Sequence, residues 1–529
     1  MVDIVGTTTF PQMWDAAVRC AGDRVFLAFL HSDGTRLEFT YREFDKVVSR
    51  TVSHLSHLGI GHGSMVAMQL CNSPWFISCL IGITKLGAIA VPVGPGATGT
   101  ELAGIYATCD AQWAIVESIH VDTHKELRFQ GLIRHGIICV DDLVSNVSGD
   151  AYCDTSIPVV IGVSQYASPD APPPDTRPNT GPTSDDIAEV MFTSGTTAAP
   201  KGVLVTHANL VYSAHVATWQ ASLRPDDRIF TTMPACHSNF QLVALTGAIL
   251  SGARLVLSEK YSASRFWSQI RTEKATVIQL TAMMARTLLL QPSSEDDSTH
   301  NVRETLYFMP LPDADKLEFE KRFGVRFMNS YGSTESICWA LTDPPVGERK
   351  WPSVGRPALG YEVSIVSPEG DHLPAGSLGE IWVKGVPGRT LMKGYLGNDQ
   401  ATHAALTEDG WLRTSDTGYY DEQGWFYFVD RARNLIKRGG ENISATEIET
   451  LLNSHPLIKE AAVIGVPDPV RDQAVKAFIQ PESDAELDTA DVASFCSMHL
   501  ASFKVPQIIE FVEDFPRTAS MKIEKRSLS

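Results

Sequence analysis

The sequence predicts an α/β protein in which a large N-terminal domain of layered sheets and helices precedes a small C-terminal α+β domain. Up to residue 157, helical periodicity alternates with short β-rich runs, a pattern typical of a mostly parallel sheet with crossover helices; the runs are MVAMQL, AIAVPV, WAIVES and GIICV. The chain has 529 residues, of which 43% are apolar. Because single hydrophobic cores stop growing at about 250–300 residues, we expect at least two domains.

Two segments of the N-terminal half predict helices by their spacing and length. Residues 41–60, YREFDKVVSRTVSHLSHLGI, repeat apolar side chains with a helical period. Residues 75–94, WFISCLIGITKLGAIAVPVG, reach the length of a membrane span, but Lys85 lies at the middle and Pro92 near the end. We interpret this run as a buried helix that leads into a strand, and we expect no transmembrane segment.

A polar segment divides this half from the rest of the large domain. Residues 168–185, SPDAPPPDTRPNTGPTSD, contain too much Pro, Asp, Thr and Gly to build a core and indicate a surface linker. The α/β alternation resumes from Ile187 to about Gly376. From Gly379, short strands between Gly and Asp turns dominate, as in GEIWVKG and GWFYFVD.

The C-terminal part changes character after the segment VDRARNLIKRGGEN. Ser444 and Glu447 have capping-box spacing at the start of a helix with Ile448, Leu451 and Leu452 on one face. AAVIGV and VKAFIQ predict strands, and DVASFCSMHL predicts a second helix. We therefore expect domains of 1–432 and 433–529.

Composition disfavours several functions. The formal net charge of -18 argues against a nucleic-acid partner, because binding to that polyanion depends on clustered Lys and Arg. Nine cysteines are scattered without a C-x-x-C pair, which indicates neither a disulfide framework nor a zinc site. The N-terminal stretch lacks the basic and apolar regions of a secretory signal. These features predict a cytoplasmic protein with reduced thiols.

The stretch MFTSGTTAAPKG at 191–202 is a candidate phosphate-binding loop between two strand-like runs. Its hydroxyls donate hydrogen bonds, its glycines allow close approach and its lysine carries a point charge; the residues are Thr193, Ser194, Gly195, Thr196, Thr197, Lys201 and Gly202. A Walker-type loop does not match, because the lysine here precedes the glycine and β-branched residues follow instead of a helix. A polar surface turn is the ordinary alternative.

Further candidates lie downstream. In NSYGSTES at 329–336, Glu335 beside Thr334 offers a carboxylate and a hydroxyl that suit Mg²⁺ held through water. Asp416 follows one strand-like run and Asp430–Arg431 ends another, placements suited to ribose hydroxyls. Lys522 lies in a basic tail. Each has an ordinary alternative: a helix N-terminal acid, a turn former, a surface ion pair or a solvated end.

Five motifs in this order resemble the signature motifs of the adenylate-forming enzymes, which include acyl-CoA synthetases, the adenylation domains of peptide synthetases and luciferases. The motifs are TSGTTAAPKG, YGSTE, WLRTSDTGYYDEQGWFYFVDR, IKRGGENIS and PRTASMKIEKR, and the resemblance covers nearly the entire chain. Within that superfamily, TMPACHSNFQ, EKYSASRFW and ERKWPSVGR look closest to the crotonobetaine/carnitine-CoA ligases.

The resemblance implies an ATP-dependent acyl-CoA ligase that activates a carboxylic acid as an acyl-adenylate, releases pyrophosphate and transfers the acyl group to coenzyme A. It implies that Thr193–Gly202 embrace the β- and γ-phosphates of ATP. Thr334 and Glu335 would serve the α-phosphate, and Thr196 and Glu335 would hold Mg²⁺.

The resemblance also assigns the remainder of the nucleotide site. Asp416 and Arg431 would bind the ribose hydroxyls, and Tyr331 would stack near the adenine. His237 would lie between the acyl pocket and the nucleotide, and Lys522 would contact the developing adenylate.

The second half-reaction is implied to follow rotation of the C-terminal domain about a hinge at Arg433. Rotation would withdraw Lys522 and bring Lys437, Gly439–Gly440 and Glu441 to the coenzyme A side. Two glycines commonly found in the family are replaced, by Met521 and Ser415, and the adenine loop reads YFMPLPDADK.

The motifs do not identify the acid. A trimethylammonium substrate such as carnitine would favour a carboxylate or an aromatic cage. Phe240 and Trp339 are the aromatic candidates for the acyl pocket, with core packing as the alternative for Trp339. Two other functions stay open: an adenylating enzyme that loads an acyl carrier protein or performs one half-reaction, and a nucleotide-binding module without turnover.

Overall fold

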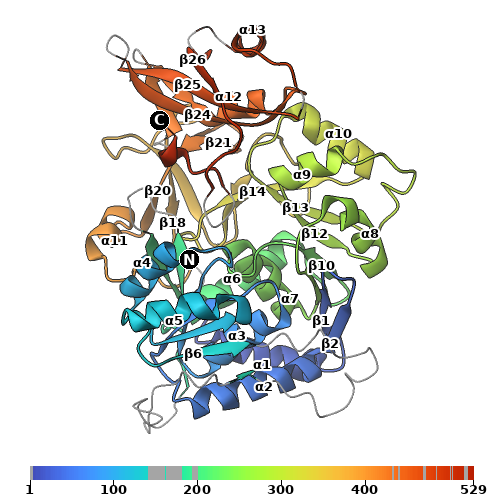
Figure 1. The fold of residues 1–529 in the computed structure, drawn as a ribbon, viewed down its shortest axis with the longest axis vertical. Coiled ribbons are helices and arrows are strands. Elements are labelled where there is room, and N and C mark those ends of the chain that lie inside the picture. Colours follow the sequence, from blue (N-terminus) through green and yellow to red (C-terminus); the bar gives the residue numbers. More distant parts are fainter. Residues whose placement is uncertain are drawn as a thin grey trace.

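The chain folds into four sheets, three in the large N-terminal part and one in the C-terminal part (Figure 1). The computed structural model describes residues 4–140, 161–162, 181–193, 200–431, 434–438, 441–468, 472–483, 485–500, 502, 504–517 and 522–528. Residues 168–180 of the predicted linker at 168–185 therefore lie outside the described part of the chain.

The first sheet has nine strands in the order β16-β15-β14-β13-β12-β10-β11-β1-β2. Its central strands are parallel, as in the pairing of Val277 in β12 with Glu304 in β13. The strands are β1 (Val25–Leu30), β2 (Arg36–Thr40), β10 (Arg228–Thr231), β11 (Arg254–Ser258), β12 (Val277–Thr281), β13 (Glu304–Phe308), β14 (Phe327–Gly332), β15 (Trp339–Thr342) and β16 (Arg356–Pro357).

The second sheet has eight strands in the order β19-β9-β8-β4-β3-β5-β6-β7. Strands β8, β4, β3, β5 and β6 run parallel, which confirms the parallel sheet predicted for the N-terminal half. The strands are β3 (Met65–Gln69), β4 (Ile89–Pro92), β5 (Trp113–Glu117), β6 (Gly136–Val140), β7 (Ile161–Gly162), β8 (Ile187–Thr193), β9 (Lys201–Thr206) and β19 (Gly394–Tyr395).

The third sheet is antiparallel and follows the order β17-β18-β20-β21. It contains the Gly- and Asp-separated strands predicted after Gly379. The strands are β17 (Glu362–Val366), β18 (Gly379–Lys384), β20 (Trp411–Tyr420) and β21 (Phe426–Arg431).

Several helices of the large part begin where a side chain caps their free N–H groups. For α2, the Thr40 hydroxyl accepts from the Glu43 N–H, and the Glu43 carboxylate accepts from the Thr40 N–H at 2.8 Å. The helices are α1 (Phe10–Ala21), α2 (Tyr41–His57), α3 (Pro74–Lys85), α4 (Gly99–Cys109), α5 (Val121–Phe129), α6 (His207–Gln220), α7 (Thr246–Ser251), α8 (Ala263–Glu273), α9 (Ala282–Leu289), α10 (Asp313–Phe323) and α11 (Asp399–Ala405), with one π-helix at Phe240–Leu245.

The apolar run at 75–94 is a buried helix followed by a strand, as the sequence predicts. It forms α3 and then β4, and the Lys85 ammonium pairs with the Asp15 carboxylate at 2.5 Å. Among the described residues, no helix combines the length and the apolar character needed to cross a membrane.

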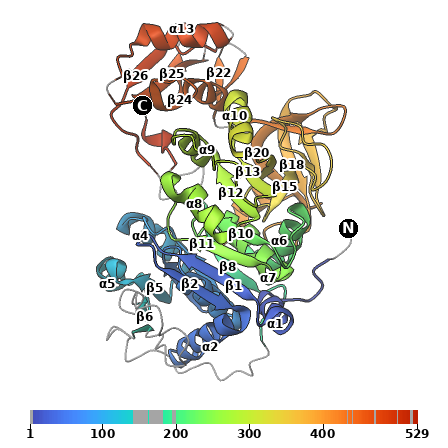
Figure 2. The same ribbon diagram turned by 90° about the vertical axis from the view of Figure 1, so that its right-hand side faces the viewer.

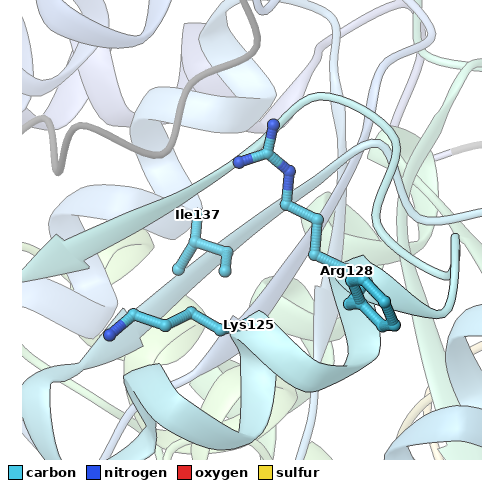
Figure 3. A pocket seen from close by; sticks show the side chains of 4 residues that line it. Lys125, Arg128 and Ile137 are labelled. Carbon is cyan, nitrogen blue, oxygen red and sulfur yellow. The ribbon is translucent and has the colours of Figure 1, made fainter.

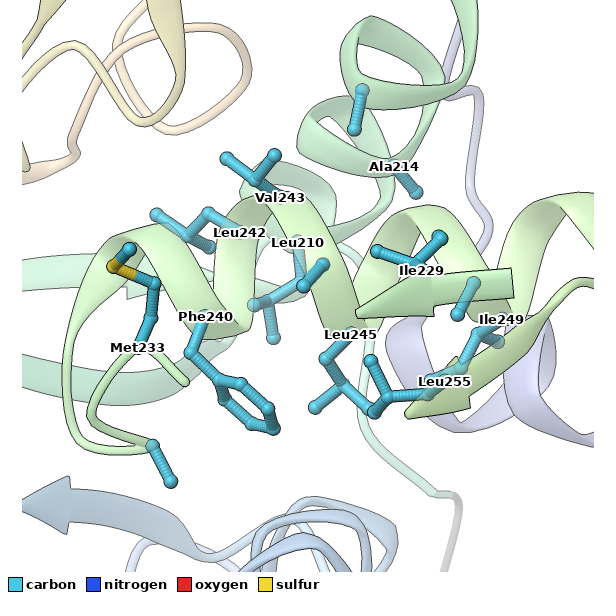
Figure 4. Packing of buried hydrophobic residues seen from close by; sticks show 14 of the residues in the cluster. Leu210, Ala214, Ile229, Met233, Phe240, Leu242, Val243, Leu245, Ile249 and Leu255 are labelled. Atoms are coloured by element: carbon cyan, nitrogen blue, oxygen red, sulfur yellow. The ribbon is translucent and has the colours of Figure 1, made fainter. Parts of the chain in front are cut away.

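One hydrophobic core joins the two large sheets. Buried side chains from α1, α2, α3, α6 and α7 pack in one cluster with residues of both sheets. Figure 4 shows part of it, where Phe240 lies among Leu210, Met233 and Leu245. This packing fixes the strand ends from which the candidate site is built.

The C-terminal part has its own sheet and its own core, and it lies at one end of the molecule (Figures 1 and 2). The sheet order is β23-β22-β25-β24, with β26 beside β25. The elements are β22 (Leu435–Arg438), β23 (Glu441–Ser444), α12 (Ala445–Leu452), β24 (Ile458–Asp468), β25 (Asp472–Pro481), α13 (Thr489–His499) and β26 (Ile508–Phe511).

The predicted capping box of α12 forms only in part. The Ser444 hydroxyl accepts from the Glu447 N–H at 3.0 Å, but the Glu447 carboxylate pairs with the Lys504 ammonium at 2.7 Å instead of returning to the cap. Ser444 is also the last residue of β23, where it is paired with Leu435 of β22.

Candidate active site

The predicted phosphate loop connects β8 to β9. Thr193 and Lys201 face each other as the last pair of this antiparallel ladder, and residues 194–199 lie outside the described part of the chain. Ser194, Gly195, Thr196 and Thr197 therefore keep their predicted roles untested. Helix α6 begins only at His207, so the strand after Lys201 excludes the Walker arrangement.

Gly202 has a packing reason to be glycine. A Cβ atom there would lie 2.7 Å from Val190 Cγ1 and 3.2 Å from Phe192 Cζ, on the neighbouring strand. Close strand packing next to the loop therefore requires glycine, whether or not phosphate binds.

Lys201 and Glu335 meet at a tyrosine that the sequence did not single out. The Lys201 ammonium lies over the Tyr395 ring, 4.9 Å from its centroid, and the Tyr395 hydroxyl donates to Glu335 Oε1 at 3.0 Å. Lys201 begins β9, Tyr395 ends β19, and Glu335 follows β14, so three separate strands bring these groups together.

The turn after β14 presents Thr334 and Glu335. The Ser333 N–H donates to the Ser336 hydroxyl at 2.8 Å, and the Ser336 N–H donates back to Ser333 Oγ at 3.2 Å. Thr334 and Glu335, which lie between these two serines in the sequence, are partly exposed. At Gly332 a Cβ atom would lie 2.5 Å from the Cys338 carbonyl oxygen, so this turn also requires its glycine.

Tyr331 and Asp416 lie together, as their predicted roles on one nucleotide require. The Tyr331 hydroxyl donates to Asp416 Oδ2 at 2.7 Å, and its ring stacks on Phe428 with centroids 5.9 Å apart. Asp416 is buried within β20, opposite Arg431 of β21, and does not follow the strand as predicted. The preceding residue, Ser415, has φ +58°, which explains why glycine is common there in the family; its N–H donates to Glu380 Oε1 at 2.7 Å.

Asp430 has a different role from the predicted one. Its carboxylate accepts from the Ser444 hydroxyl at 2.8 Å, the Thr446 N–H at 2.9 Å and the Thr446 hydroxyl at 3.1 Å. These bonds cap α12, and Asp430 is fully buried, so it does not lie on the surface as the ordinary alternative supposed. The backbone of Arg431 pairs with Asp416, and its side chain lies outside the described residues.

His237 is held as a neutral donor. Its Nδ1 accepts from the Asn239 N–H at 3.2 Å, which leaves the ring proton on Nε2. Burial, together with a smaller effect of the positive charge of Lys522, lowers the pKa of His237 to about 4. Because that charge acts on His237, this orientation of the C-terminal part places Lys522, an exposed residue, near the large part.

The other predicted residues of the C-terminal part are only partly visible. Lys437 lies in β22 and Glu441 in β23, but their side chains are outside the described residues. Gly439–Gly440 and Arg433 also lie outside them.

The two aromatic residues predicted for the acyl pocket differ in their surroundings. Phe240 is fully buried and packs edge-to-face on Phe76, so its side chain presents no free surface. Trp339 is 5% exposed, its ring lies 5.3 Å from that of Phe308, and its buried indole Nε1 has no hydrogen-bond partner. Phe240 is therefore a core residue. Trp339, for which core packing was the alternative, is also buried in the core cluster but keeps an indole N–H without a partner.

Asn72 is a second residue that sequence reasoning missed. Its amide donates to the Met233 and Ser258 carbonyls at 3.0 and 3.1 Å, and its Oδ1 accepts from the Ala235 N–H at 2.7 Å. These bonds hold the segment that ends at His237 against the end of β11. No local pattern marks such a residue, because all three partners are distant backbone groups.

The structure also has a surface hollow of about 410 Å³ (Figure 3). It is lined by Lys125, Arg128, Phe129 and Ile137 on α5 and β6. It contains none of the predicted site residues.

The donor set suits Mg²⁺ bound mainly through nucleotide phosphates. Within the described ranges, no group of three His, Cys, Asp or Glu side chains could hold a metal by itself. Mg²⁺ typically uses one or two carboxylates together with substrate phosphates, and Glu335 supplies one partly exposed carboxylate beside Thr334.

Strand ends bring Lys201 and Glu335 together at Tyr395, and the charge of Lys522 from the small C-terminal unit acts on His237. This arrangement fits an AMP-binding enzyme. The family model for AMP-binding enzymes matches residues 14–396, and that for the AMP-binding enzyme C-terminal domain matches residues 447–522. The chain belongs to this family.

The chain is also similar to individual proteins over its full length. It is 40% identical, over 528 residues and 100% of both chains, to a crotonobetaine/carnitine–CoA ligase of Salmonella heidelberg (strain SL476). It is similar to the o-succinylbenzoate coenzyme A synthetase MenE of Bacillus subtilis in complex with AMP, with a TM-score of 0.81, 25% identity and 98% of each chain covered. ATP-bound MatB of Rhodopseudomonas palustris has the same fold, with a TM-score of 0.81, 24% identity and 98% of each chain covered.

Proposed function

We propose that this protein is an ATP-dependent acyl-CoA ligase of the AMP-forming type. It activates a carboxylic acid as an acyl-adenylate with release of pyrophosphate and then transfers the acyl group to coenzyme A. The observation that carries the proposal is the meeting of Lys201 and Glu335 at Tyr395, because it puts a cation and a carboxylate from separate motifs at one place. The full-length similarity to a CoA ligase supports the same chemistry.

In the first half-reaction, the acid attacks the α-phosphate of ATP and pyrophosphate leaves. Charge builds on the phosphate oxygens, so fixed cations and donors accelerate the step. Lys201 and the hydroxyl loop from Thr193 would bind the β- and γ-phosphates, Thr334 the α-phosphate, and Lys522 the developing adenylate. Mg²⁺, held by Glu335 and Thr196, supplies further positive charge when bound.

His237 would orient the acid. At neutral pH the ring is uncharged and carries its proton on Nε2, because Nδ1 accepts the Asn239 N–H and the pKa is about 4. A neutral N–H donor can hold a carboxylate oxygen without the tight ion pair that would weaken the carboxylate as a nucleophile.

Asp416 would bind the ribose hydroxyls once its hydrogen bond from the Tyr331 hydroxyl is broken. Its Oδ2 accepts from the Tyr331 hydroxyl, so the phenol holds one oxygen of this buried carboxylate in the structure. We expect nucleotide binding to exchange part of this bond for ribose hydroxyls, with Arg431 on the paired strand as the second ribose ligand.

We extend the proposal to two domains, 1–432 and 433–529, which alternate about Arg433. The separate hydrophobic core of the C-terminal unit supports this division. In the present orientation the charge of Lys522 acts on His237. Rotation would replace Lys522 by Lys437, Gly439–Gly440 and Glu441 at the entry for coenzyme A.

For the substrate we propose a small carnitine-like acid. The name of the 40% identical relative supports this class. The buried and unpartnered Trp339 Nε1, beside Phe308, offers a donor and an aromatic face to such an acyl group. Free coenzyme A is the proposed acceptor, and the phosphopantetheine arm of an acyl carrier protein is the alternative.

The test uses purified full-length protein and a panel of acids that includes carnitine, crotonobetaine and acids without a cation. Acid-dependent exchange of pyrophosphate into ATP measures the first half-reaction, and thioester formation with free coenzyme A measures both. Exchange without thioester favours a carrier-protein acceptor. Absence of exchange with every acid overturns the proposed function.

A further inference from the structure

Tyr395 lies where two of the predicted catalytic segments meet. It belongs to the short strand β19, to which we assigned no role in the reaction. Strand β19 pairs antiparallel with β9, with Tyr395 opposite Val203 and Gly394 opposite Leu204. This register puts the tyrosine ring beside the start of β9, where Lys201 lies over it.

The tyrosine is itself held firmly. Its N–H donates to the Thr402 hydroxyl of α11 at 2.9 Å, and only 8% of the residue is exposed. Gly394 has φ +154°, and a Cβ atom there would lie 2.9 Å from Thr402 Cγ2, so the segment packs closely on α11. The Met392 N–H also donates to the Glu335 carbonyl at 2.9 Å, which fixes the Glu335 backbone to the same segment.

The two contacts of Tyr395 are with opposite charges on different sides of the ring. The ammonium of Lys201 lies over the face, and the carboxylate of Glu335 accepts from the hydroxyl at the edge. In the described part of the chain, the side-chain contacts of Lys201 and Glu335 run to the two sides of Tyr395, and no ion pair joins them. A direct pair would neutralise both groups, because unit charges at close contact attract strongly even near a protein surface.

We propose that Tyr395 is a positioning residue that keeps Lys201 and Glu335 apart and separately oriented, the lysine toward the nucleotide phosphates and the carboxylate toward Mg²⁺. This rests on the proposed function, since the roles of both partners come from it. The hydroxyl and the ring act on different partners, so they can be separated by mutation.

The bond runs from the phenol to the carboxylate, because the hydroxyl donates and the carboxylate oxygen accepts. It orients Glu335 Oε1, so the other carboxylate oxygen would remain for the metal.

The experiment compares Tyr395→Phe, which removes only the hydroxyl, with Tyr395→Leu, which also removes the aromatic face. ATP binding is measured by calorimetry without acid, first in EDTA and then over a magnesium titration. Tyr41→Phe is the matched control, because it also removes a buried tyrosine hydroxyl, one that donates to the Ala248 and Ala253 carbonyls in another part of the chain.

For Tyr395→Phe we expect that half-maximal stimulation of ATP binding requires a roughly tenfold higher magnesium concentration. The reason is that Glu335 loses a hydrogen bond to its charged carboxylate. Metal-free ATP binding should stay at the wild-type value. Tyr395→Leu should in addition weaken metal-free ATP binding by about two- to fivefold, since Lys201 loses its cation–π contact.

Equal effects of Phe and Leu, or a wild-type magnesium requirement in Tyr395→Phe, overturn the proposal. So does a lowered melting temperature, matched by Tyr41→Phe, with no change in magnesium dependence, because that is the signature of a structural role alone. Wild-type protein that fails to bind magnesium-ATP at all refutes the proposed function instead, which distinguishes the two failures.

Discussion

Asp430 makes the sharpest prediction, because one buried carboxylate ties the large part of the chain to the C-terminal part. It ends β21 and accepts three hydrogen bonds from Ser444 and Thr446 at the start of α12. Arg433, the proposed hinge, lies between these residues in sequence. Rotation about it would leave Asp430 in place and carry α12 away, so the contact belongs to one orientation.

The cost of losing the contact follows from its bonds. Asp430→Ala removes a helix cap, worth about 0.5–2 kcal/mol. It also removes the acceptor of the partly buried Thr446 N–H and hydroxyl, at about 1–3 kcal/mol, part of which relaxation recovers, whereas the Ser444 hydroxyl still donates to the Val429 carbonyl. We expect a net loss of roughly 2–3 kcal/mol for this orientation. Since each 1.4 kcal/mol is about a factor of ten, the orientation equilibrium shifts by roughly 30- to 150-fold.

The assay separates the half-reactions. Asp430→Asn, which keeps the shape and one acceptor oxygen, should slow acid-dependent pyrophosphate exchange about tenfold, and Asp430→Ala should slow it more. Thioester formation from supplied acyl-adenylate should keep its wild-type rate, because that step uses the rotated orientation.

Asp488→Ala is the control, since Asp488 also caps a helix, α13, but within the C-terminal part. It should change stability and leave both half-reactions alone. The reasoning is refuted if Asp430→Asn slows both half-reactions equally, or if exchange is unchanged while α12 is destabilised.

Three further predictions follow from other residues. Lys522→Ala should abolish pyrophosphate exchange and spare thioester formation from supplied acyl-adenylate, and Lys437→Ala should show the reverse; equal loss in both assays contradicts the exchange of lysines. Glu189 is fully buried in β8 without a partner, and burial raises its pKa to about 8, so the folded state keeps a proton that the unfolded state releases above about pH 4.5. Its contribution to stability is complete below pH 4.5 and is lost as the pH rises toward 8, by roughly 3 kcal/mol at pH 7. Glu189→Gln should therefore melt at a higher temperature than wild type at pH 8 and at an equal temperature at pH 4.5, and parallel melting curves at both pH values would contradict this. Asn72→Ala should lower kcat about tenfold or more and leave metal-free ATP binding unchanged, because the His237 segment loses three hydrogen bonds; an equal loss in ATP affinity would point to general destabilisation.

Much of the fold could be predicted from short-range patterns. The strand 187–193, the helix from Tyr41 and the helix–strand run at 75–94 all occur where periodicity and length place them. The order of five motifs was also enough to identify the family, because each motif is a continuous segment. The capping of α12 was predicted less well, because the Glu447 carboxylate pairs with the Lys504 ammonium, 57 residues away in the sequence.

The amino-acid sequence by itself determined the family and the supply of reactive groups, because these reside in local composition and spacing. Only the tertiary structure decided how the groups pair: Tyr395 with Glu335 across 60 residues, Tyr331 with Asp416 across 85, and Asp430 with α12. The reason is physical. Periodicity and propensity act over a few neighbouring residues, whereas the partner of a buried charge is set by which distant strand ends the packed core brings together.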